Sequence, residues 1–390
     1  MPPAAPSQVA EVPVSAQTVR FDTLPFALAE LRPELDAAIA AVLDRGQLAR
    51  GPELPAFEAE FAAECNAHYC VGVGSGMDAL ELILRAYGIG PGDEVLVPAH
   101  AFVATWLAVS HVGATPVPVE VDPRTYCLAA PSVRYTGLVD ALTPRTKALV
   151  AADLYGRKVP TRHLAPFCKL HGIALIIDAS QAHGARAVDG TERGLIGDAA
   201  AFSFHPTANL GCLGDGGAVV SDDASLIERV RHLRGYGATV DAGSDVHGLH
   251  SRLDEIQAAV LRVRLRHLDD WNRRRQDLAS KYLAILQGQV EVLSPPGDAA
   301  SCDVWHNFVV RTSRRDALAE HLRKAGIETA VDPKVPCHQS AAYAREFAGR
   351  SFPVAEALAA QCLSLPLSPH HTADQIGYVA AAVRTFIAAR

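Results

Sequence analysis

Residues 147–180 read KALVAADLYGRKVPTRHLAPFCKLHGIALIIDAS, and they contain two short apolar runs, 147–156 and 173–180, on either side of a helical pattern. Further strands are predicted by four similar runs, at 94–98, 115–122, 199–204 and 217–222. Near-continuous apolar strands separated by crossovers are typical of a parallel or mostly parallel sheet that is covered on both faces. We therefore predict an α/β fold whose ligands gather at the carboxyl ends of the strands.

Helical patterns and a second lobe flank this central region. Helices are predicted across residues 33–44 and in PAFEAEFAAEC, 55–65, where Phe57 and Phe61 recur at helical spacing. From Arg252 to about residue 286, the apolar stripe predicts one long helix that bridges two lobes. The remainder alternates strand-like and helical pieces, as in a smaller α+β domain. We expect a loose N-terminal extension over 1–20, a large domain over 21–265 and a small domain over 266–390.

The composition excludes several classes of protein. The chain has 390 residues, of which 49% are hydrophobic and 20% charged, as in a folded globular protein. Its formal net charge of −7 gives no broad positive field, so we expect neither a nucleic-acid nor a membrane partner. The eight cysteines form no C-x-x-C pair, which favours free thiols over a metal or redox site. The N-terminus lacks the basic start and apolar core of a secretion signal, so we expect a cytoplasmic protein.

The segment VGVGSGMDALELILRA, 71–86, predicts a strand that runs through Gly72, Gly74 and Gly76 into a helix beginning near Asp78. Such a turn points free backbone N–H groups and the helix dipole at an anion. It is not the G-x-G-x-x-G dinucleotide fingerprint, because the third glycine would have to fall at Met77. Taken alone, the segment is either a phosphate cradle or an ordinary tight turn between a strand and a helix.

The segment LIIDASQAHGA, 175–185, places Asp178 at the end of an apolar strand and therefore at the ligand-binding edge of the sheet. A buried carboxylate there needs a cationic partner, and a protonated heteroaromatic nitrogen is one candidate. The alternative is a helix cap or a structural ion pair. Gln181 and His183 follow closely enough to bond a ligand over the strand ends, or to act as ordinary cap residues.

A third segment, AAFSFHPTANLGCLGDGGAVV at 200–220, predicts a strand, a turn rich in proline and glycine, and a second strand. Ser203 could donate to a phosphate, and His205 could take part in proton transfer. Taken alone, each is more typical of a loop residue that forms local hydrogen bonds.

Together, these three segments resemble the DegT/StrS family of sugar aminotransferases, which are pyridoxal-phosphate enzymes of the aspartate aminotransferase fold (fold type I). The resemblance runs from about residue 20 to the C-terminus. It includes LARGPELPAFEAEFA (48–62), GDEVLVPAHAFVATWLAV (92–109), LYGRKVPTRHL (154–164), SRLDEIQAAVLRVRL (251–265) and LSLPLSPH (363–370). It implies a mostly parallel sheet of the seven-stranded type, a smaller C-terminal α+β domain, and a homodimer whose two subunits share each active site.

The resemblance also implies a cofactor contact for most of the candidate residues. These contacts are Gly76, Met77 and Ser203 around the phosphate, Phe102 on the pyridine ring, Asp178 at the ring nitrogen, Gln181 near the phenolic oxygen, and His250 at the phosphate of the neighbouring subunit. An aspartate that keeps the pyridinium protonated strengthens the ring as an electron sink. Met77 and His250 depart from the family's usual threonine and asparagine, but a backbone N–H and an imidazole still offer donors to a phosphate.

One departure bears directly on catalysis. The family motif S-F-[HY]-P-x-K-N-L-G carries the lysine that forms the internal aldimine and shuttles the proton, and here that position is Ala208. A methyl group does neither, so we expect a severely impaired transaminase. Because the flanking residues are intact, we favour a deliberate Lys-to-Ala substitution that traps the external aldimine over a natural homologue without the lysine. A sugar dehydratase would have to borrow His205 as its base, and Lys158 is expected at the surface rather than in the lysine's place.

The substrate is also inferred from the resemblance. The wording TWLAV (105–109) and AVLRVRLRHLDDWNRRR (259–275) is most similar to enzymes that aminate keto-deoxysugars linked to a nucleoside diphosphate, particularly 3-keto-6-deoxyhexoses, with L-glutamate as the amino donor. The arginines of 262–275 either include a diphosphate contact or form a solvated helix face. A different class of function is a non-catalytic homologue that binds a nucleotide sugar or a cofactor adduct, as a regulatory or scaffold partner.

Overall fold

The computed structural model of the chain describes residues 18–129, 137–186, 197–239, 243–292 and 303–389. The expected N-terminal extension therefore lies mostly outside the described residues. Its last part belongs to the folded body, since Val19 is buried and forms a parallel β-bridge with Ile327.

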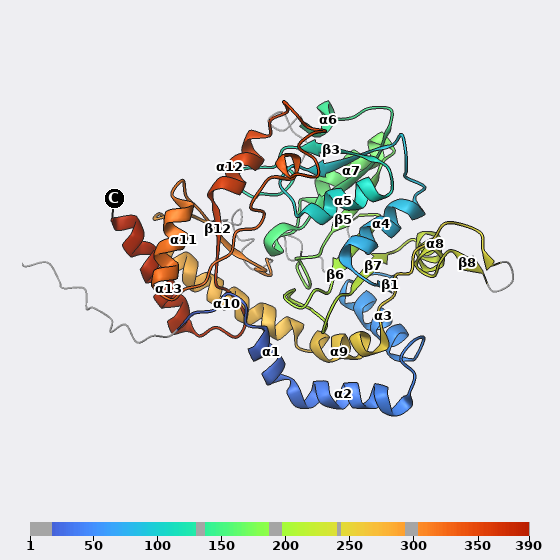
Figure 1. Cartoon of the computed structure of the whole chain (residues 1–390), viewed down its shortest axis with the longest axis horizontal. Coiled ribbons are helices and arrows are strands. Elements are labelled where there is room, and N and C mark those ends of the chain that lie inside the picture. The colour runs from blue at the N-terminus through green and yellow to red at the C-terminus, as the bar shows by residue number, and fades with distance from the viewer. Residues whose placement is uncertain (1–17, 130–136, 187–196, 240–242, 293–302, 390) are drawn as a thin grey trace, which may run out of the picture.

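Seven strands form the central sheet in the order β1-β7-β6-β5-β4-β2-β3 (Figure 1). Their bounds are β1 Tyr69–Val73, β2 Glu94–Pro98, β3 Thr115–Val119, β4 Thr146–Ala152, β5 Ala174–Asp178, β6 Ala199–Ser203 and β7 Gly217–Ser221. The strands β3, β2, β4, β5 and β6 are parallel, whereas β7 runs antiparallel to both β6 and β1. The mostly parallel sheet is confirmed, and each apolar run in the sequence coincides with a strand.

Helices cover both faces of this sheet (Figure 1). One face carries α3 (Glu53–Glu64), α7 (Thr161–His171) and α9 (Glu255–Leu265). The opposite face carries α4 (Gly76–Ala86), α5 (Val103–His111) and α8 (Ala224–Arg234). Within β5, Leu175 and Ile177 enter the first of these clusters and Ile176 the second, as the two-residue period of a strand requires. Burial on both faces explains why these strands are almost wholly apolar.

The segment predicted as one long helix is two helices. α9 ends at Leu265, and α10 spans Leu268–Leu286 after His267, whose φ is −102° and ψ −6°. α9 packs on α2 (Arg32–Arg45) and α3, whereas α10 packs on α13 (Ala373–Ala388) in the C-terminal domain. The prediction of one continuous helix is wrong, because the apolar side chains of α9 and those of α10 pack against different helices, and the chain breaks between them. The two consecutive helices still connect the two lobes.

A smaller C-terminal domain combines an antiparallel sheet with helices, as predicted. Its strands are β10 Glu291–Val292, β11 Phe308–Arg311 and β12 Cys362–Leu365, and its helices include α11 (Arg315–Lys324), α12 (Pro353–Gln361) and α13. The remaining elements are α1 (Leu24–Glu30), α6 (Gly137–Asp140), the hairpin β8 (Ala238–Thr239) with β9 (Gly243–Ser244), and single turns at Leu154–Gly156 and Cys337–Gln339. The domain limits drawn from the sequence stay a prediction.

Within the described part of the chain, no helix is long and apolar enough to cross a membrane. Nor do its His, Cys, Asp and Glu side chains form a group placed to hold a metal ion. Every cysteine there carries a free thiol, as predicted, and Cys302 lies outside the described residues.

Candidate active site

A cavity of about 380 Å³ opens at the carboxyl ends of the parallel strands. It brings together all the predicted site residues except His250: Gly76, Met77, Phe102, Asp178, Gln181, Ser203, His205 and Ala208. These residues span 132 positions of the chain, from Gly76 to Ala208. His306 and Asp332 from the C-terminal domain also line the cavity. The convergence is what a single ligand site requires.

The first turn of α4 forms an anion cradle. Ser75 caps the helix by accepting the Asp78 N–H at 3.1 Å, and the helix begins at Gly76 rather than near Asp78 as predicted. In the described structure, no acceptor meets the N–H groups of Gly76 and Met77, which are orphan donors of a helix start. A Cβ added at Gly76 would lie 2.6 Å from the Ser203 Cβ, so only glycine leaves this space open. The residues present therefore fit a phosphate.

Asp178 supplies a buried carboxylate at the end of β5. It is 8% exposed, and its Oδ2 accepts the Thr105 hydroxyl at 2.7 Å while its Oδ1 accepts the Ser180 N–H at 3.2 Å. No lysine, arginine or histidine among the described residues pairs with it. The structural ion pair considered from the sequence is therefore excluded there, and a cationic ligand atom fits the site. Thr105 itself was missed, although it lies only three residues after Phe102, in the first turn of α5.

Gln181 and Phe102 complete the walls around this carboxylate. The Gln181 Oε1 accepts the Tyr155 N–H at 2.6 Å, which orients the amide and leaves its NH₂ group as the donor. Phe102 precedes the first residue of α5 and is 50% exposed, so its ring presents an open face to the cavity. A half-exposed phenyl ring and a buried carboxylate in the walls of one cavity fit a flat, cationic heteroaromatic ligand.

The loop after β6 carries the remaining candidates. The Ser203 Oγ accepts the His205 N–H at 3.3 Å, which leaves its own hydrogen free to donate into the cradle. The His205 ring is exposed, and its Nδ1 lies 3.0 Å from the Thr207 Oγ1. Ala208 is buried at the cavity wall, where its N–H donates to the His205 carbonyl at 2.8 Å. No lysine lines this cavity in the described chain.

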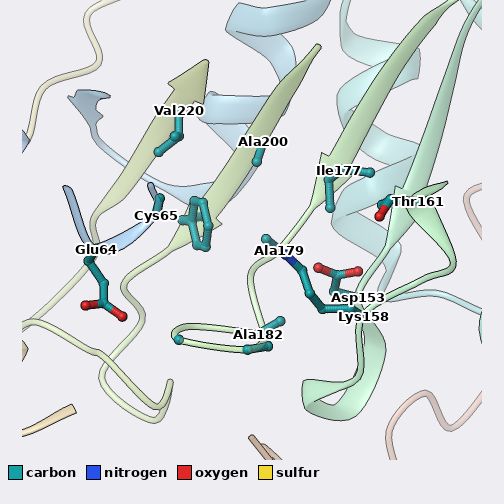
Figure 2. Close-up of a pocket in the computed structure, with 13 residues that line it drawn as sticks. Glu64, Cys65, Asp153, Lys158, Thr161, Ile177, Ala179, Ala182, Ala200 and Val220 are labelled. Carbon is teal, nitrogen blue, oxygen red and sulfur yellow. The ribbon is translucent and has the colours of Figure 1, made fainter. Parts of the chain in front are cut away.

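Lys158 lines a second, smaller cavity of about 40 Å³, together with Glu64 and Cys65 from the end of α3 (Figure 2). The expectation of a surface lysine is wrong, because Lys158 is half-buried and lies beside Asp153. Asp153 belongs to the walls of both cavities, and its Oδ1 accepts the Val159 N–H at 2.8 Å. Burial raises the pKa of Asp153 to about 6, although Lys158 opposes the rise.

Two histidines that the sequence suggested as ligand contacts do not line the cavity. His183 is fully buried against the rings of Phe61, Phe202 and Phe204, and burial lowers its pKa to about 3. It is a core residue, not a ligand contact. His250 is exposed and stacks on Tyr236, with ring centroids 4.9 Å apart. Its role toward a neighbouring subunit stays a prediction.

His306 is a site residue that the sequence did not reveal. It lies two residues before the apolar strand β11, and it lines the cavity together with Ala208. Its Nδ1 lies 3.3 Å from the Asn209 Oδ1, and burial lowers its pKa to about 3, assisted by Arg275. No local pattern distinguishes this histidine, because only the docking of the C-terminal domain brings it to the site.

Comparison with known proteins identifies the family of this chain. Residues 29–384 match the DegT/DnrJ/EryC1/StrS aminotransferase family. The chain is 50% identical over 367 residues to dTDP-3-amino-3,4,6-trideoxy-alpha-D-glucose transaminase of Streptomyces venezuelae, covering 94% of this chain and 95% of that protein. It is 48% identical over 367 residues to the erythromycin biosynthesis sensory transduction protein EryC1 of Saccharopolyspora erythraea, covering 94% and 99%.

A solved structure is equally similar. The crystal structure of S. venezuelae DesV in complex with a ketimine intermediate has a TM-score of 0.89 and 49% identity, covering 95% of this chain and 98% of that chain. The fold is that of the pyridoxal-phosphate-dependent aminotransferases of fold type I, as the sequence resemblance implied. The chain belongs to the DegT/DnrJ/EryC1/StrS aminotransferase family.

Proposed function

We propose that this chain is built to bind pyridoxal phosphate and to aminate a keto-deoxysugar linked to a nucleoside diphosphate, with L-glutamate as donor. The observation that carries the proposal is the unpaired, buried carboxylate of Asp178, which shares one cavity with the free N–H groups of Gly76 and Met77. A ligand that is anionic at one end and cationic in its ring satisfies both features. The relative that is 50% identical to this chain is a 3-amino-deoxysugar transaminase, which supports a 3-amino-deoxysugar as the product.

Each residue has a definite task in this proposal. Gly76, Met77 and Ser203 hold the phosphate, Asp178 keeps the ring nitrogen protonated, and Phe102 packs against the ring. When bound, the cofactor supplies an electron sink for bonds at the substrate carbon that carries nitrogen. Thr105 orients the Asp178 carboxylate, and Gln181 offers its NH₂ group to the cofactor's phenolic oxygen. The proposal further includes a homodimer in which His250 reaches the partner's cofactor phosphate.

We also propose that Ala208 occupies the position of the family's catalytic lysine. Its methyl group supplies neither a nucleophilic amine nor a proton acceptor, so this chain is severely impaired in transamination. Lys158 does not replace the lysine, because it lines the smaller cavity and not the one that holds Ala208. A deliberate Lys-to-Ala substitution accounts for an otherwise intact cofactor site.

The test is the absorbance spectrum of Ala208→Lys with pyridoxal phosphate, recorded before and after L-glutamate, beside the chain as given. We expect the visible pyridoxal band of Ala208→Lys to bleach on adding glutamate, and no such change in the parent. An Ala208→Lys protein that is folded and loaded with cofactor, yet inert toward glutamate and other amino donors, would falsify the proposed activity.

A second candidate is a lysine-less homologue that binds a nucleotide sugar or a cofactor adduct without transamination. Two observations favour it: Ala208 itself, and the sensory-transduction name of a relative 48% identical to this chain. It predicts that neither the parent nor Ala208→Lys shows a cofactor band, while a nucleoside-diphosphate sugar still binds. A dehydratase is less favoured, because the His205 ring is exposed and engaged with Thr207.

A further inference from the structure

A third cavity, of about 150 Å³, adjoins the candidate active site. It lies between the N-terminal segment 21–27, the junction of α9 and α10, and residues 367–370. It shares Thr207, Ala208 and His306 with the cofactor cavity. A small ligand in this cavity would therefore lie against the residue that replaces the catalytic lysine.

Two buried guanidinium groups line this cavity, and neither has a carboxylate partner among the residues that the structure describes. Arg264 is 4% exposed, and its Nη1 donates to the Gly211 carbonyl at 2.6 Å. Its buried Nε meets no acceptor, and no hydrogen bond within the described part of the chain uses its Nη2. Arg275 is 8% exposed, and within the described segments it donates only to the carbonyls of Trp305 and Leu367, at 3.2 and 2.9 Å. Burial lowers both pKa values to about 10, so both groups stay charged at neutral pH.

Two other arginines of this protein, by contrast, form ion pairs with carboxylates. Arg157, equally buried, pairs with Asp303 at 2.9 Å, and Arg262 on the same helix as Arg264 pairs with Glu53 and Glu60. A buried charge without a partner of opposite charge is costly, and an anionic ligand would supply that partner here. The Arg264 guanidinium lies over the ring of Trp271, 5.3 Å from its centroid, and such a planar guanidinium is the group that binds a carboxylate through two parallel hydrogen bonds.

Among the described residues around the cavity, no carboxylate forms an ion pair with either arginine. The Asp22 Oδ1 accepts the Leu24 N–H at 2.8 Å, and no ion pair in the described structure joins Asp22 to either arginine. Glu30 outside the cavity is engaged by Arg274 and His370. Burial, with the arginines, lowers the pKa of His306 to about 3 and of His370 to about 4, so neither histidine adds charge at neutral pH.

We propose that this cavity binds a carboxylate of the amino donor, an acidic amino acid, and of the 2-oxo acid that the donor leaves behind, with Arg264 as the specificity-determining residue. The inference rests on the proposed function for the identity of the ligand. The anion site itself rests only on the two unpaired arginines and the cavity. The proposal thus names the arginine that contacts the amino donor, which the sequence alone did not distinguish from the other arginines.

The direct test is a calorimetric titration of glutarate, a dicarboxylate without an amine, into the full-length chain. We expect binding that weakens about tenfold or more in Arg264→Gln, because a charged fork is lost. Arg264→Lys, which keeps the charge but not the fork, should lie between them. Arg266→Gln is the matched control, since Arg266 is exposed and pairs with Glu34 instead. Circular dichroism melts show whether each variant is folded.

Several results would overturn the inference. These are no glutarate binding to the folded parent, equal binding to Arg264→Gln, or equally tight binding of inorganic phosphate and chloride, which would indicate an adventitious ion site only. The Ala208→Lys background separates this inference from the proposed function. If Ala208→Lys reacts with no donor while glutarate binding still depends on Arg264, the proposed activity fails and the anion site stands. If Ala208→Lys consumes glutamate with a KM that Arg264→Gln leaves unchanged, the donor assignment fails and the activity stands.

Discussion

The Thr105 hydroxyl donates to the Asp178 Oδ2 at 2.7 Å, and both side chains are more than nine-tenths buried. This contact joins the first turn of α5 to the end of β5 and fixes the direction in which the carboxylate faces the cavity. A hydrogen bond to a charged group contributes about 1.5–3 kcal/mol, so its loss should affect ligand binding measurably.

Thr105→Val keeps the shape of this side chain and removes the donor. We expect the Kd for pyridoxal phosphate to rise about tenfold, because the carboxylate loses the bond that orients it. Quenching of tryptophan fluorescence during a cofactor titration measures the change. Thr105→Ser retains the hydroxyl and should bind nearly as the parent does; equal affinity of the Val variant would show that Thr105 orients nothing.

Gly76→Ala tests the cradle at the start of α4. The new methyl group would lie 2.6 Å from the Ser203 Cβ, so we expect a loss of about 1–3 kcal/mol in stability and weaker phosphate binding. Gly377→Ala is the control, because a Cβ there meets nothing within 4 Å on helix α13. That variant should gain about 0.5–1 kcal/mol from helix propensity. A Gly76→Ala protein with the parent's melting temperature and affinity would contradict the cradle.

Asp153 should impose a pH dependence on stability. Its folded-state pKa of about 6 lies above the ordinary value, so the native chain holds an extra proton between about pH 4 and 6, and stability falls as the pH rises through this window. Asp153→Asn keeps an acceptor for the Val159 N–H and removes the charge. We expect it to gain up to about 3 kcal/mol over the parent at pH 8 and little below pH 4.

Urea unfolding at several pH values between 4 and 8 measures this effect. Asp316→Asn is the control, since the Asp316 side chain is 89% exposed. It should leave the slope of the parent's profile unchanged over pH 4 to 6. An Asp153→Asn profile parallel to that of the parent would mean that Asp153 does not titrate in this window.

The buried pair of Arg157 and Asp303 connects the turn after β4 to the chain that leads into β11. Asp303→Asn removes the carboxylate that holds the Arg157 guanidinium at 2.9 Å, and we expect a loss of about 3–5 kcal/mol. The double variant Arg157→Met with Asp303→Leu should recover most of this loss, because it buries no charge. Chemical denaturation measures both, and Arg32→Gln, at an exposed pair with Asp36, should show no change. A single variant as stable as the parent would show that the pair is dispensable.

Much of the site was visible in the sequence, because its residues directly follow apolar strands. The runs ending near Asp178 and Ser203 predicted strands, and parallel strands deliver their carboxyl ends to one edge of a sheet. The same local reasoning misplaced His183, which follows Asp178 by five residues but turns into an aromatic core. It also missed Thr105, although Phe102 lies three residues before it, and it missed His306, which only the docking of the C-terminal domain brings to the cavity.

The sequence by itself determined the order of strands and helices, the mostly parallel sheet and the family, since these depend on apolar periodicity and on motifs within single segments. Only the tertiary structure decided which charges are paired. Arg262, Arg264, Arg266 and Arg275 look alike in the sequence, yet Arg262 and Arg266 pair with glutamates at 2.6–3.0 Å. The other two lie buried with no carboxylate partner in the part of the chain that the structure describes. The physical reason is that burial and ion pairing depend on which other segments pack against a helix, and the break between α9 and α10 sets that packing.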